Sequence, residues 1–424
     1  MIAELAEALG EAPQDVTPLG GGAGRCEMWS LTAGGRPLVF RRYPEGADRD
    51  VVRLREWRVL ELARQGGVPV PAPVALTPTG IVVERVPGEA RPQRLLADDR
   101  WARARSVLVE RVAGAAARLH AIEPPGFLPR AMELAGPPPD SPVTATDAAI
   151  ATVERCLDQA GEPHPAVELG LRWLRANAPA PAPVSIVHGD LRLSNLVVAE
   201  DGSPALIDWE LVHTGDGAED LGWMCVRSWR FGAADPALGC GSREELLDAY
   251  AAAGGRRVTL EELRWWEVCG NARWAAICVL QADRHLSGRD RSLDRAMIGR
   301  RTCEAEWDLL ALLAGGRAAP PASHALQDGP DARELLRAVA EYLREDLRPR
   351  APAEDAFRLA VAANACRVVA RELPPEDPAA RDPARKLGAE LRGGAHDGAL
   401  DALVDPLRAE VLAKLEVANP GWAR

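Results

Sequence analysis

Residues 184–210 read VSIVHGDLRLSNLVVAEDGSPALIDWE, and the interpretation of the whole chain starts from this stretch. It contains three short apolar runs that are typical of strands, and an Asp-Gly pair between the second and third runs is typical of a β-hairpin turn. We expect the strands at 184–187, 196–198 and 205–207. The hairpin should therefore bring the end of the third strand beside the loop that follows the first.

Polar residues stand at these two places. Asp190 and Asn195 lie in the loop after the first strand, and Asp208 follows the third. Phosphoryl transfer from ATP needs a group that accepts the hydroxyl proton and oxygen ligands for magnesium. Isolated His, Asp and Asn residues in loops usually cap turns or face water, but an ordered set between strands favours a catalytic role.

The pattern H-G-D-x-x-x-x-N followed by I-D-W resembles the catalytic segment of the aminoglycoside phosphotransferase and choline kinase branch of the protein-kinase-like fold. The resemblance implies that Asp190 is the catalytic base, that Asn195 and Asp208 are magnesium ligands, and that His188 shapes the loop. It implies ATP and Mg²⁺ as cofactors. The implied fold class is α+β, a two-lobed protein-kinase-like fold, here followed by a small all-α domain.

The composition of the 424 residues, 47% apolar and 27% charged, is that of a soluble globular protein. No apolar run is as long as a membrane span, and residues 1–12 are acidic where a signal peptide would be basic, so we expect a cytoplasmic location without membrane contact. The net charge of -11 argues against a nucleic-acid partner. The eight cysteines lack a C-x-x-C pair, which favours buried, reduced thiols.

A glycine cluster precedes two predicted strands at 26–32 and 37–41, and its members are Gly20, Gly21, Gly22 and Gly24. Backbone amides of such a loop can approach phosphates closely, so we assign these glycines to nucleotide binding. The pattern G-x-x-x-x-G-K-[ST] is absent, which excludes a P-loop.

The resemblance implies that the strand at 37–41 carries the basic residue for the ATP phosphates. That residue is Arg41, where most members of the family have Lys. The helix expected at 50–65 offers Glu56 as its ion-pair partner. Arg keeps the charge of Lys but differs in geometry, which leaves open a subfamily that uses Arg or a weakened catalyst.

The apolar run at 81–88 ends in a glycine turn and resembles the hinge between the two lobes. The backbone groups of Glu84 to Val86 would meet adenine there.

Three later segments, 223–232, 265–288 and 299–310, resemble the branch of the family that is fused to, or encoded beside, acyl-CoA dehydrogenases. In that branch the acceptor is a hydroxyl on an acyl-CoA chain, and Arg stands in place of the Lys. The resemblance implies a small-molecule acceptor, with a hydroxyacyl-CoA as one candidate.

Basic side chains in these segments suggest an anchor for an anionic acceptor such as a CoA phosphate. They are Arg227, Arg230, Arg273, Arg284 and His285. Aminoglycosides are cations, so an Arg-rich substrate lobe argues against antibiotic resistance.

A Gly-, Ala- and Pro-rich break at 315–323 predicts a domain boundary. We expect an N-terminal lobe at 1–88, a C-terminal lobe at 89–315 and a helical domain at 325–424. Apolar residues at helical spacing predict three helices in the last domain, with Pro330 and Pro406 in first turns. It resembles an uncharacterised helical domain that accompanies such kinases, and a docking role toward a protein partner or a second copy is our hypothesis.

Two functions follow from the sequence. The favoured one is an ATP- and Mg-dependent phosphotransferase that acts on an alcohol group of a small molecule. The alternative is a catalytically inactive kinase-like protein that binds a nucleotide or metabolite and regulates a partner. The complete set of Asp190, Asn195 and Asp208 favours the enzyme, whereas Arg41 mildly favours the alternative.

Overall fold

The computed structural model describes residues 1–19, 26–46, 49–136, 144–323 and 326–423. The chain divides into two compact units. Unit 1 comprises Met1–Glu133, Pro137–Thr146 and Ala180–Glu267, and unit 2 comprises Leu134–Gly136, Asp147–Pro179 and Val268–Arg424. The described residues that the sequence assigns to catalysis all belong to unit 1.

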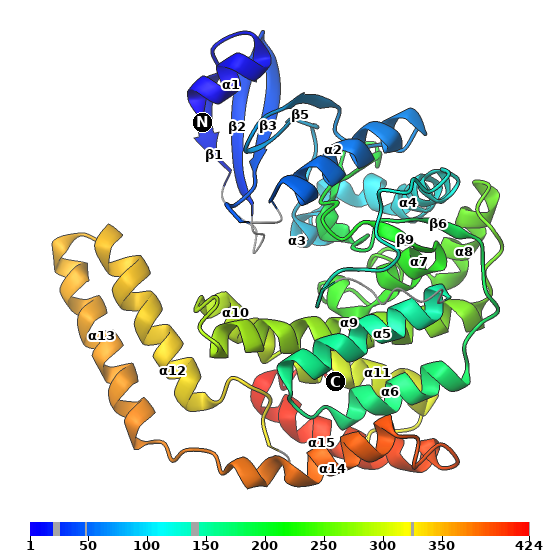
Figure 1. Ribbon diagram of the computed structural model, residues 1–424, viewed down its shortest axis with the longest axis vertical. Helices are drawn as coiled ribbons and strands as arrows, with labels where there is room; N and C mark the ends of the chain where they lie inside the picture. Colours follow the sequence, from blue (N-terminus) through cyan, green and yellow to red (C-terminus); the bar gives the residue numbers. More distant parts are fainter. Residues whose placement is uncertain (20–25, 47–48, 137–143, 324–325, 424) are drawn as a thin grey trace. The chain divides into compact units, whose positions relative to one another are not determined.

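Unit 1 begins with a five-stranded sheet in the order β1-β2-β3-β5-β4, whose neighbouring strands are antiparallel (Figure 1). The strands are β1 (Gln14–Pro18), β2 (Glu27–Ala33), β3 (Arg36–Arg42), β4 (Pro73–Leu76) and β5 (Gly80–Glu84). Because side chains alternate along a strand, Phe40 and Arg41 of β3 point to opposite faces. Phe40 packs with Leu5 of helix α1 (Ile2–Leu9), so Arg41 is left on the other face, where it meets helix α2.

Helix α2 (Arg49–Gln65) agrees with the helix predicted at 50–65. Its buried positions include Glu56, Val59, Leu60 and Ala63, which recur at the i, i+3, i+4, i+7 spacing of one helical face. The apolar members join the main core of the unit. Glu56 is therefore buried with them, and this burial requires an ionic or hydrogen-bonding partner.

The segment 184–216 forms two small antiparallel ladders. They are β6 (Val184–Val187) with β9 (His213–Asp216), and β7 (Leu196–Val198) with β8 (Pro204–Leu206). The hairpin around Gly202, which has φ +86°, is confirmed, and its second strand lies one residue earlier than predicted. The Ile207 N–H donates to the Asn195 carbonyl oxygen at 3.0 Å, so the end of the hairpin adjoins the loop after β6, as expected.

The remaining described elements of unit 1 are helical. They are α3 (Pro92–Ala97), η1 (Asp99–Trp101), α4 (Ala102–His120), η2 (Leu193–Asn195), α7 (Ala218–Cys225), η3 (Arg227–Trp229), α8 (Arg243–Ala252) and the first part of α9 (Leu260–Leu286). Helix α4 contacts both ladders. Leu108, Val112 and Leu119 of α4 are almost fully buried in one cluster with Leu193 and Leu221. This shared core fixes the loop after β6 on a rigid base.

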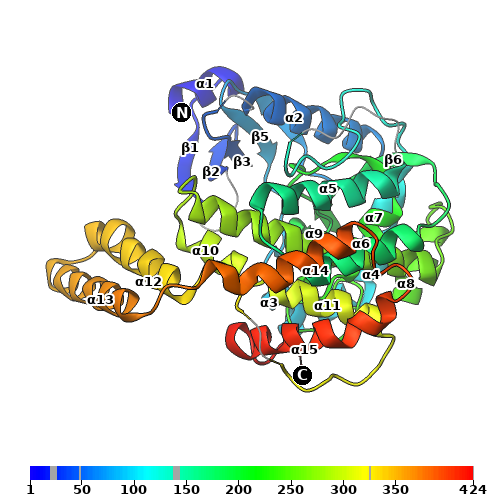
Figure 2. The same cartoon turned by 60° about the horizontal axis from the view of Figure 1, so that its bottom comes forward.

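Unit 2 is helical among its described residues. Its elements are most of α5 (Ala145–Ala160), α6 (Pro165–Ala176), the second part of α9, α10 (Leu293–Gly299), α11 (Thr302–Ala314), α12 (Ala332–Glu341), η4 (Tyr342–Leu347), η5 (Arg348–Arg350), α13 (Ala353–Glu372), η6 (Pro378–Arg381), α14 (Asp382–Arg392) and α15 (Leu400–Ala418). Helices α12 and α13 pack on each other, whereas α14 packs on α6 and α15 packs on α11 and α6 (Figure 2). The C-terminal region is helical as predicted, but α14 and α15 share their packing with helices that precede it, and the boundary at 315–325 stays a prediction.

Pro330 and Pro406, which were predicted in first helical turns, do not stand there. Pro330 precedes Asp331, the N-cap of α12, whose side chain accepts a hydrogen bond from the Glu334 amide. Pro406 lies inside α15, which begins at Leu400. The sequence argument assumed that a proline in a helical region marks the first turn of a helix, where proline is tolerated. Helix α15 instead contains Pro406 in its interior, although proline lacks the backbone N–H that would donate there.

The predicted mixed fold class is confirmed. No helix in the described parts of the chain has the length and apolar character needed to cross a membrane. Five of the eight cysteines are buried, and the remaining three, Cys26, Cys240 and Cys366, are partly exposed.

Candidate active site

The loop after β6 is held by the side chain of Asp220 in α7. Its carboxylate accepts hydrogen bonds from the amides of His188 and Gly189 at 2.8 and 3.0 Å, and it lies 3.1 Å from Nε2 of His120. Burial would raise the pKa of Asp220, but the His120 hydrogen bond and the loop amides hold it below its ordinary value. Gly189 has φ +80°, and a Cβ there would lie 2.4 Å from the Leu211 carbonyl oxygen, so the loop requires glycine.

His188 supports the loop from within. Its ring is fully buried and lies against Trp209, with 4.4 Å between the ring centroids, and its Nε2 is 3.2 Å from the Ile207 carbonyl oxygen. Burial lowers the pKa of His188, and the nearby Asp220 only partly opposes this. A neutral, packed histidine is thus suited to shape the loop.

The Asp190 carboxylate is fixed by three side chains. Its Oδ1 accepts hydrogen bonds from Trp223 Nε1 and Arg192 Nε, each at 2.8 Å, and its Oδ2 accepts from Asn195 Nδ2 at 2.6 Å. The side chain is 11% exposed. Asp190 is therefore held in one orientation while part of its carboxylate still reaches solvent.

Arg41 joins the sheet, α2 and the end of the hairpin. Its guanidinium donates to Glu56 at 3.1 Å and to Asp208 at 2.8 Å, so the predicted ion pair with Glu56 is present. The hydroxyl of Tyr43 donates to the other oxygen of Glu56. Burial would lower the pKa of Arg41, but Glu56 and Asp208 raise it well above its ordinary value, so the guanidinium stays charged.

Asp208 and Asn195 leave oxygen atoms available. Among the described residues, the hydrogen bonds of Asn195 Nδ2 go to Asp190, those of Asp208 involve only Oδ1, and neither Asn195 Oδ1 nor Asp208 Oδ2 has a protein partner. Asp208 also has φ +68°, a conformation that costs a non-glycine residue on the order of 1 kcal/mol and clusters at functional sites. Carboxylate and amide oxygens are the ligands that magnesium prefers, so this donor set fits the ion.

Glu210 belongs to the same group, although the sequence argument did not select it. Its carboxylate lies 3.9 Å from the Arg41 guanidinium. Burial and the neighbouring Asp208 carboxylate raise the pKa of Glu210 to about 7. The side chain keeps 38% exposure, so solvent moderates this rise.

The remaining nucleotide-binding predictions are less defined. Gly20, Gly21, Gly22 and Gly24 lie outside the described residues. Glu84 ends β5, its amide donates to the Ala72 carbonyl oxygen, and its exposed side chain lies 3.9 Å from Arg36. Val86 follows in the segment between β5 and α3. The role of Glu84 and Val86 in adenine binding remains a prediction.

The basic group proposed for an anionic acceptor is not free as a set. Arg230 donates to the Cys225 carbonyl oxygen and lies 3.0 Å from Glu267, Arg273 is only 6% exposed, and His285 is fully buried beside Glu334. These three side chains serve internal contacts. The sequence pattern could not show this, because helical spacing does not tell which basic residues meet an acid inside the fold.

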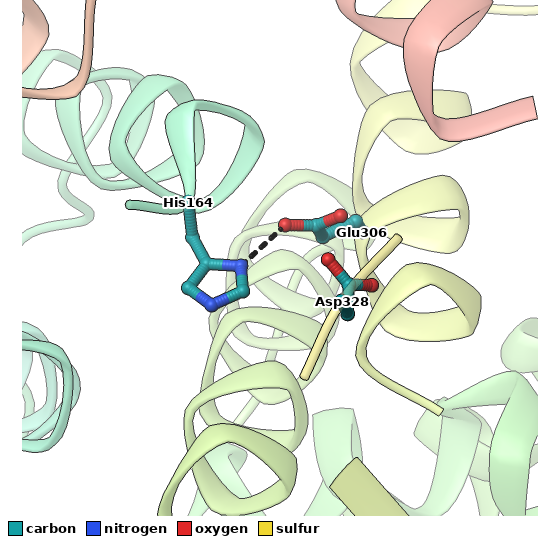
Figure 3. A group of neighbouring side chains, drawn as sticks. All are labelled: His164, Glu306 and Asp328. Carbon is teal, nitrogen blue, oxygen red and sulfur yellow. Dashed lines mark hydrogen bonds and ion pairs between the residues drawn. The ribbon is translucent and has the colours of Figure 1, made fainter. Parts of the chain in front are cut away.

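A second cluster of potential metal ligands lies in unit 2. His164, Glu306 and Asp328 are all buried and point toward one another (Figure 3). His164 Nδ1 lies 2.9 Å from Glu306, but the Lys414 ammonium donates to Glu306 at 3.0 Å and to Asp328 at 2.8 Å. Because Lys414 already supplies a positive charge to both carboxylates, we assign this cluster to helix packing and not to a metal.

Burial and pairing have opposite effects on the charges of this cluster. Burial would raise the pKa of Glu306, but Lys414 and His164 hold it at about 2. Burial would lower the pKa of Lys414, yet the two carboxylates raise it. Glu306 and Lys414 therefore form an ion pair that joins α11 to α15.

Four residues of the site in unit 1 were missed by the sequence argument. They are Tyr43, Arg192, Glu210 and Trp223. Tyr43, Arg192 and Glu210 each stand two positions after a predicted site residue, a spacing that could have suggested them. Trp223 comes from another segment, and only the fold brings it to Asp190.

Comparison with known proteins supports the family resemblance. The model of a family described as "Phosphotransferase enzyme family" matches residues 15–266, and "Domain of unknown function (DUF6285)" matches residues 349–422. Both agree with the resemblances predicted from sequence.

Two solved structures share the fold. A protein from Ralstonia eutropha assigned as an aminoglycoside phosphotransferase has a TM-score of 0.57 and 20% identity, covering 74% of this chain and 98% of its own. A thermostable mutant of aminoglycoside phosphotransferase APH(4)-Ia, in a ternary complex with AMP-PNP and hygromycin B, has a TM-score of 0.51 and 18% identity, covering 75% of this chain and 99% of its own.

One curated relative is Acyl-CoA dehydrogenase family member 10 of Mus musculus, with 36% identity over 64 residues. These are 15% of this chain and 6% of that protein, so the chain matches only a small part of the relative. The phosphotransferase match, in contrast, spans more than half of the 424 residues. The chain therefore belongs to the phosphotransferase enzyme family.

Proposed function

We propose that the protein transfers the γ-phosphoryl group of ATP to an alcohol hydroxyl of a small molecule. The observation that carries this proposal is the pairing of Asp190 with Asn195 and of Arg41 with Asp208, two pairs that the backbone hydrogen bond from Ile207 to Asn195 brings beside each other within unit 1. Membership of the phosphotransferase family supports the reaction class. The shared fold with a phosphotransferase bound to AMP-PNP supports a nucleoside triphosphate as the donor.

Asp190 is the general base in this proposal. The acceptor oxygen forms a bond to the γ-phosphorus while the bond from that phosphorus to the bridging oxygen breaks, and the electron pair of the broken bond leaves with ADP. The hydroxyl proton goes to Asp190. Trp223 and Arg192 orient the carboxylate for this transfer, because both bind the same oxygen of it.

Asn195 and Asp208 would hold magnesium, since each offers an oxygen that has no partner among the described residues. Magnesium supplies charge neutralisation on the phosphates when it is bound. Arg41, oriented by Glu56, provides a second fixed cation for phosphate oxygens. The glycine loop at 20–24 and the backbone of Glu84 to Val86 are proposed to hold the rest of the nucleotide.

For the acceptor we propose a hydroxyacyl-CoA. The support is the 36% identity to part of Acyl-CoA dehydrogenase family member 10. A small molecule with an alcohol group also suits a site in which the proposed base is a single, partly exposed carboxylate.

The test is ADP release by the purified protein, with and without magnesium, across hydroxyacyl-CoA, sugar, aminoglycoside and choline-like acceptors. One acceptor should stimulate release, and Asp190→Asn should lower that rate by about 10²–10⁴-fold, the usual contribution of general base catalysis. Asp201→Asn, the same substitution at the exposed hairpin turn, is the matched control and should retain activity.

The ion pair between Arg41 and Asp208 gives the regulatory alternative a specific basis, because it engages a proposed magnesium ligand. If ATP binds, no acceptor stimulates release and Asp190→Asn behaves like the unmodified protein, the enzyme proposal fails. A nucleotide-binding regulatory protein would then be the better description.

A further inference from the structure

Arg192 lies in the loop between the proposed base and the proposed magnesium ligand Asn195. Its Nε donates to Asp190 Oδ1 at 2.8 Å, and its side chain is 25% exposed. The residue is also the N-cap of η2, the short turn that carries Asn195. Arg192 is thus anchored at both the backbone and the side chain within the site.

The guanidinium of Arg192 is held in place by an aromatic surface. It stacks on the ring of Trp229 at 4.3 Å from the ring centroid. Trp229 is only 4% exposed, and its ring lies 5.1 Å from that of Trp223, which binds the same Asp190 oxygen. Stacking of this kind contributes about 0.5–2 kcal/mol, enough to select one orientation of a long side chain.

The two terminal nitrogens of Arg192 differ from the paired nitrogens of Arg41 and Arg243. Arg41 uses both terminal nitrogens for Glu56 and Asp208, and Arg243 uses two nitrogens for Glu267. Throughout the described residues, the hydrogen bond to Asp190 is the one that the Arg192 side chain makes, and its terminal nitrogens bind no protein atom. These two nitrogens form a planar fork of donors that has no hydrogen-bond acceptor among the described residues.

Such a fork suits two oxygen atoms of one anionic group. Building on the proposed function, the group that must pass through this place is the phosphoryl group in transit, because it lies in line between the acceptor oxygen at Asp190 and the leaving oxygen. This holds for every acceptor, whereas an anionic group of the acceptor itself would suit the fork only in some substrates.

We propose that Arg192 is a catalytic residue whose terminal nitrogens bind the oxygens of the transferring phosphoryl group. The fork stabilises the charge on these oxygens as the bond to the acceptor forms and the bond to ADP breaks. Its orientation is set before the reaction by Asp190 and Trp229, so little reorganisation is needed in the transition state.

The test compares kcat and KM of Arg192→Ala, Arg192→Lys and the control Arg111→Ala, an exposed arginine of the same unit. For Arg192→Ala, kcat should fall by about 10²–10³-fold with every acceptor, as for loss of an oxyanion donor. The KM for the acceptor should stay within about twofold, because the substitution removes an interaction that is made in the transition state and not with the bound acceptor. Arg192→Lys should recover part of kcat, and Arg111→Ala should match the unmodified protein.

A rise of acceptor KM with unchanged kcat would overturn the proposal and assign Arg192 to an anionic group of the acceptor. Unchanged values of both would also overturn it and leave Arg192 a structural role.

A binding arm separates this inference from the proposed function. Calorimetry with magnesium measures the affinity for ADP alone and for ADP with orthovanadate, an analogue of the phosphoryl group in transit. Orthovanadate should tighten binding in the unmodified protein, and Arg192→Ala should lose at least about tenfold of that gain, or 1.4 kcal/mol, without change for ADP alone. If no acceptor supports turnover, the proposed function fails, yet this arm still decides the role of Arg192: an equal gain in both proteins, or none in either, refutes it.

Discussion

The ionisable cluster around Asp190 and Asp208 in unit 1 differs from the cluster around Glu306 and Lys414 in unit 2, although both combine carboxylates with a cation. In unit 1 the side chains of Asp208 and Glu210 are 32% and 38% exposed. In unit 2 the side chains of Glu306 and Asp328 are 0% and 5% exposed, and one ammonium binds both. The first cluster therefore keeps oxygen atoms for a ligand, and the second uses its charges internally.

This difference teaches that residue type and spacing alone do not identify a binding site. His164, Glu306 and Asp328 lie close enough together for a metal site. However, the Lys414 ammonium already pairs with the carboxylates of Glu306 and Asp328. Removing one partner of a buried pair exposes the full desolvation cost of the other. The cluster in unit 2 should consequently control stability, and the cluster in unit 1 should control turnover.

The largest expected effect on stability is that of Lys414→Met. Two buried carboxylates would lose their cation, and we expect the free energy of unfolding to fall by about 3–5 kcal/mol. Chemical denaturation of the purified protein measures this. Lys386→Met, at an 80% exposed lysine of α14, should change it little. Equal effects of the two substitutions would show that the buried ion pair contributes no more to the free energy of unfolding than an exposed lysine does.

A smaller effect is expected for Arg41→Lys in unit 1. One ammonium cannot reproduce the separate hydrogen bonds that two nitrogens make to Glu56 and Asp208. We expect kcat/KM for ATP to fall by about tenfold, or 1.4 kcal/mol. Arg42→Lys, at the neighbouring and more exposed arginine, serves as the control. A gain in activity would mean that Lys is the better residue here and that Arg41 restrains the enzyme.

The smallest effect is a pH dependence of stability that comes from Glu210. Its folded pKa of about 7 is above the ordinary 4.5, so the folded state binds more protons than the unfolded state between these values. The contribution of Glu210 to stability therefore decreases as pH rises from 4.5 to 7. Glu210→Gln should be more stable than the unmodified protein at pH 8 and similar to it at pH 5.

Thermal unfolding midpoints across pH 5–8 measure this difference. Glu200→Gln, at a carboxylate that is 67% exposed, is the control and should show no such trend. A difference that grows toward low pH would contradict the raised pKa of Glu210.

The sequence predicted unit 1 well because its signals are local. Strand alternation, the Asp-Gly turn and the helical spacing on α2 each follow from residues close together in the chain. The contact of Arg41 with Glu56 was implied by the family resemblance, and the structure contains it. The catalytic segment could be recognised because its pattern spans only 188–208. Asn195 binds Asp190, and the amide of Ile207, the residue before Asp208, donates to the Asn195 carbonyl oxygen. The roles of Asp190, Asn195 and Asp208 remain predictions.

The contacts that the sequence could not predict join residues far apart in the chain. Trp223 reaches Asp190 only because α7 follows β9, and Lys414 pairs with Glu306 across more than a hundred residues. The internal contacts of Arg230 and His285, two members of the proposed basic group, were missed for the same reason. Whether a charge is free or internally paired depends on tertiary packing, which helical periodicity does not encode.

The most direct test of this account measures both kcat for phosphoryl transfer and the free energy of unfolding for Asp190→Asn and Lys414→Met. The account predicts that Asp190→Asn loses at least about 100-fold in kcat while stability stays within about 1 kcal/mol. Lys414→Met should lose several kcal/mol of stability but keep its kcat at a temperature where it is folded. Retained turnover in Asp190→Asn, or lost turnover in folded Lys414→Met, would contradict the claim that the cluster in unit 1 controls turnover and the cluster in unit 2 controls stability.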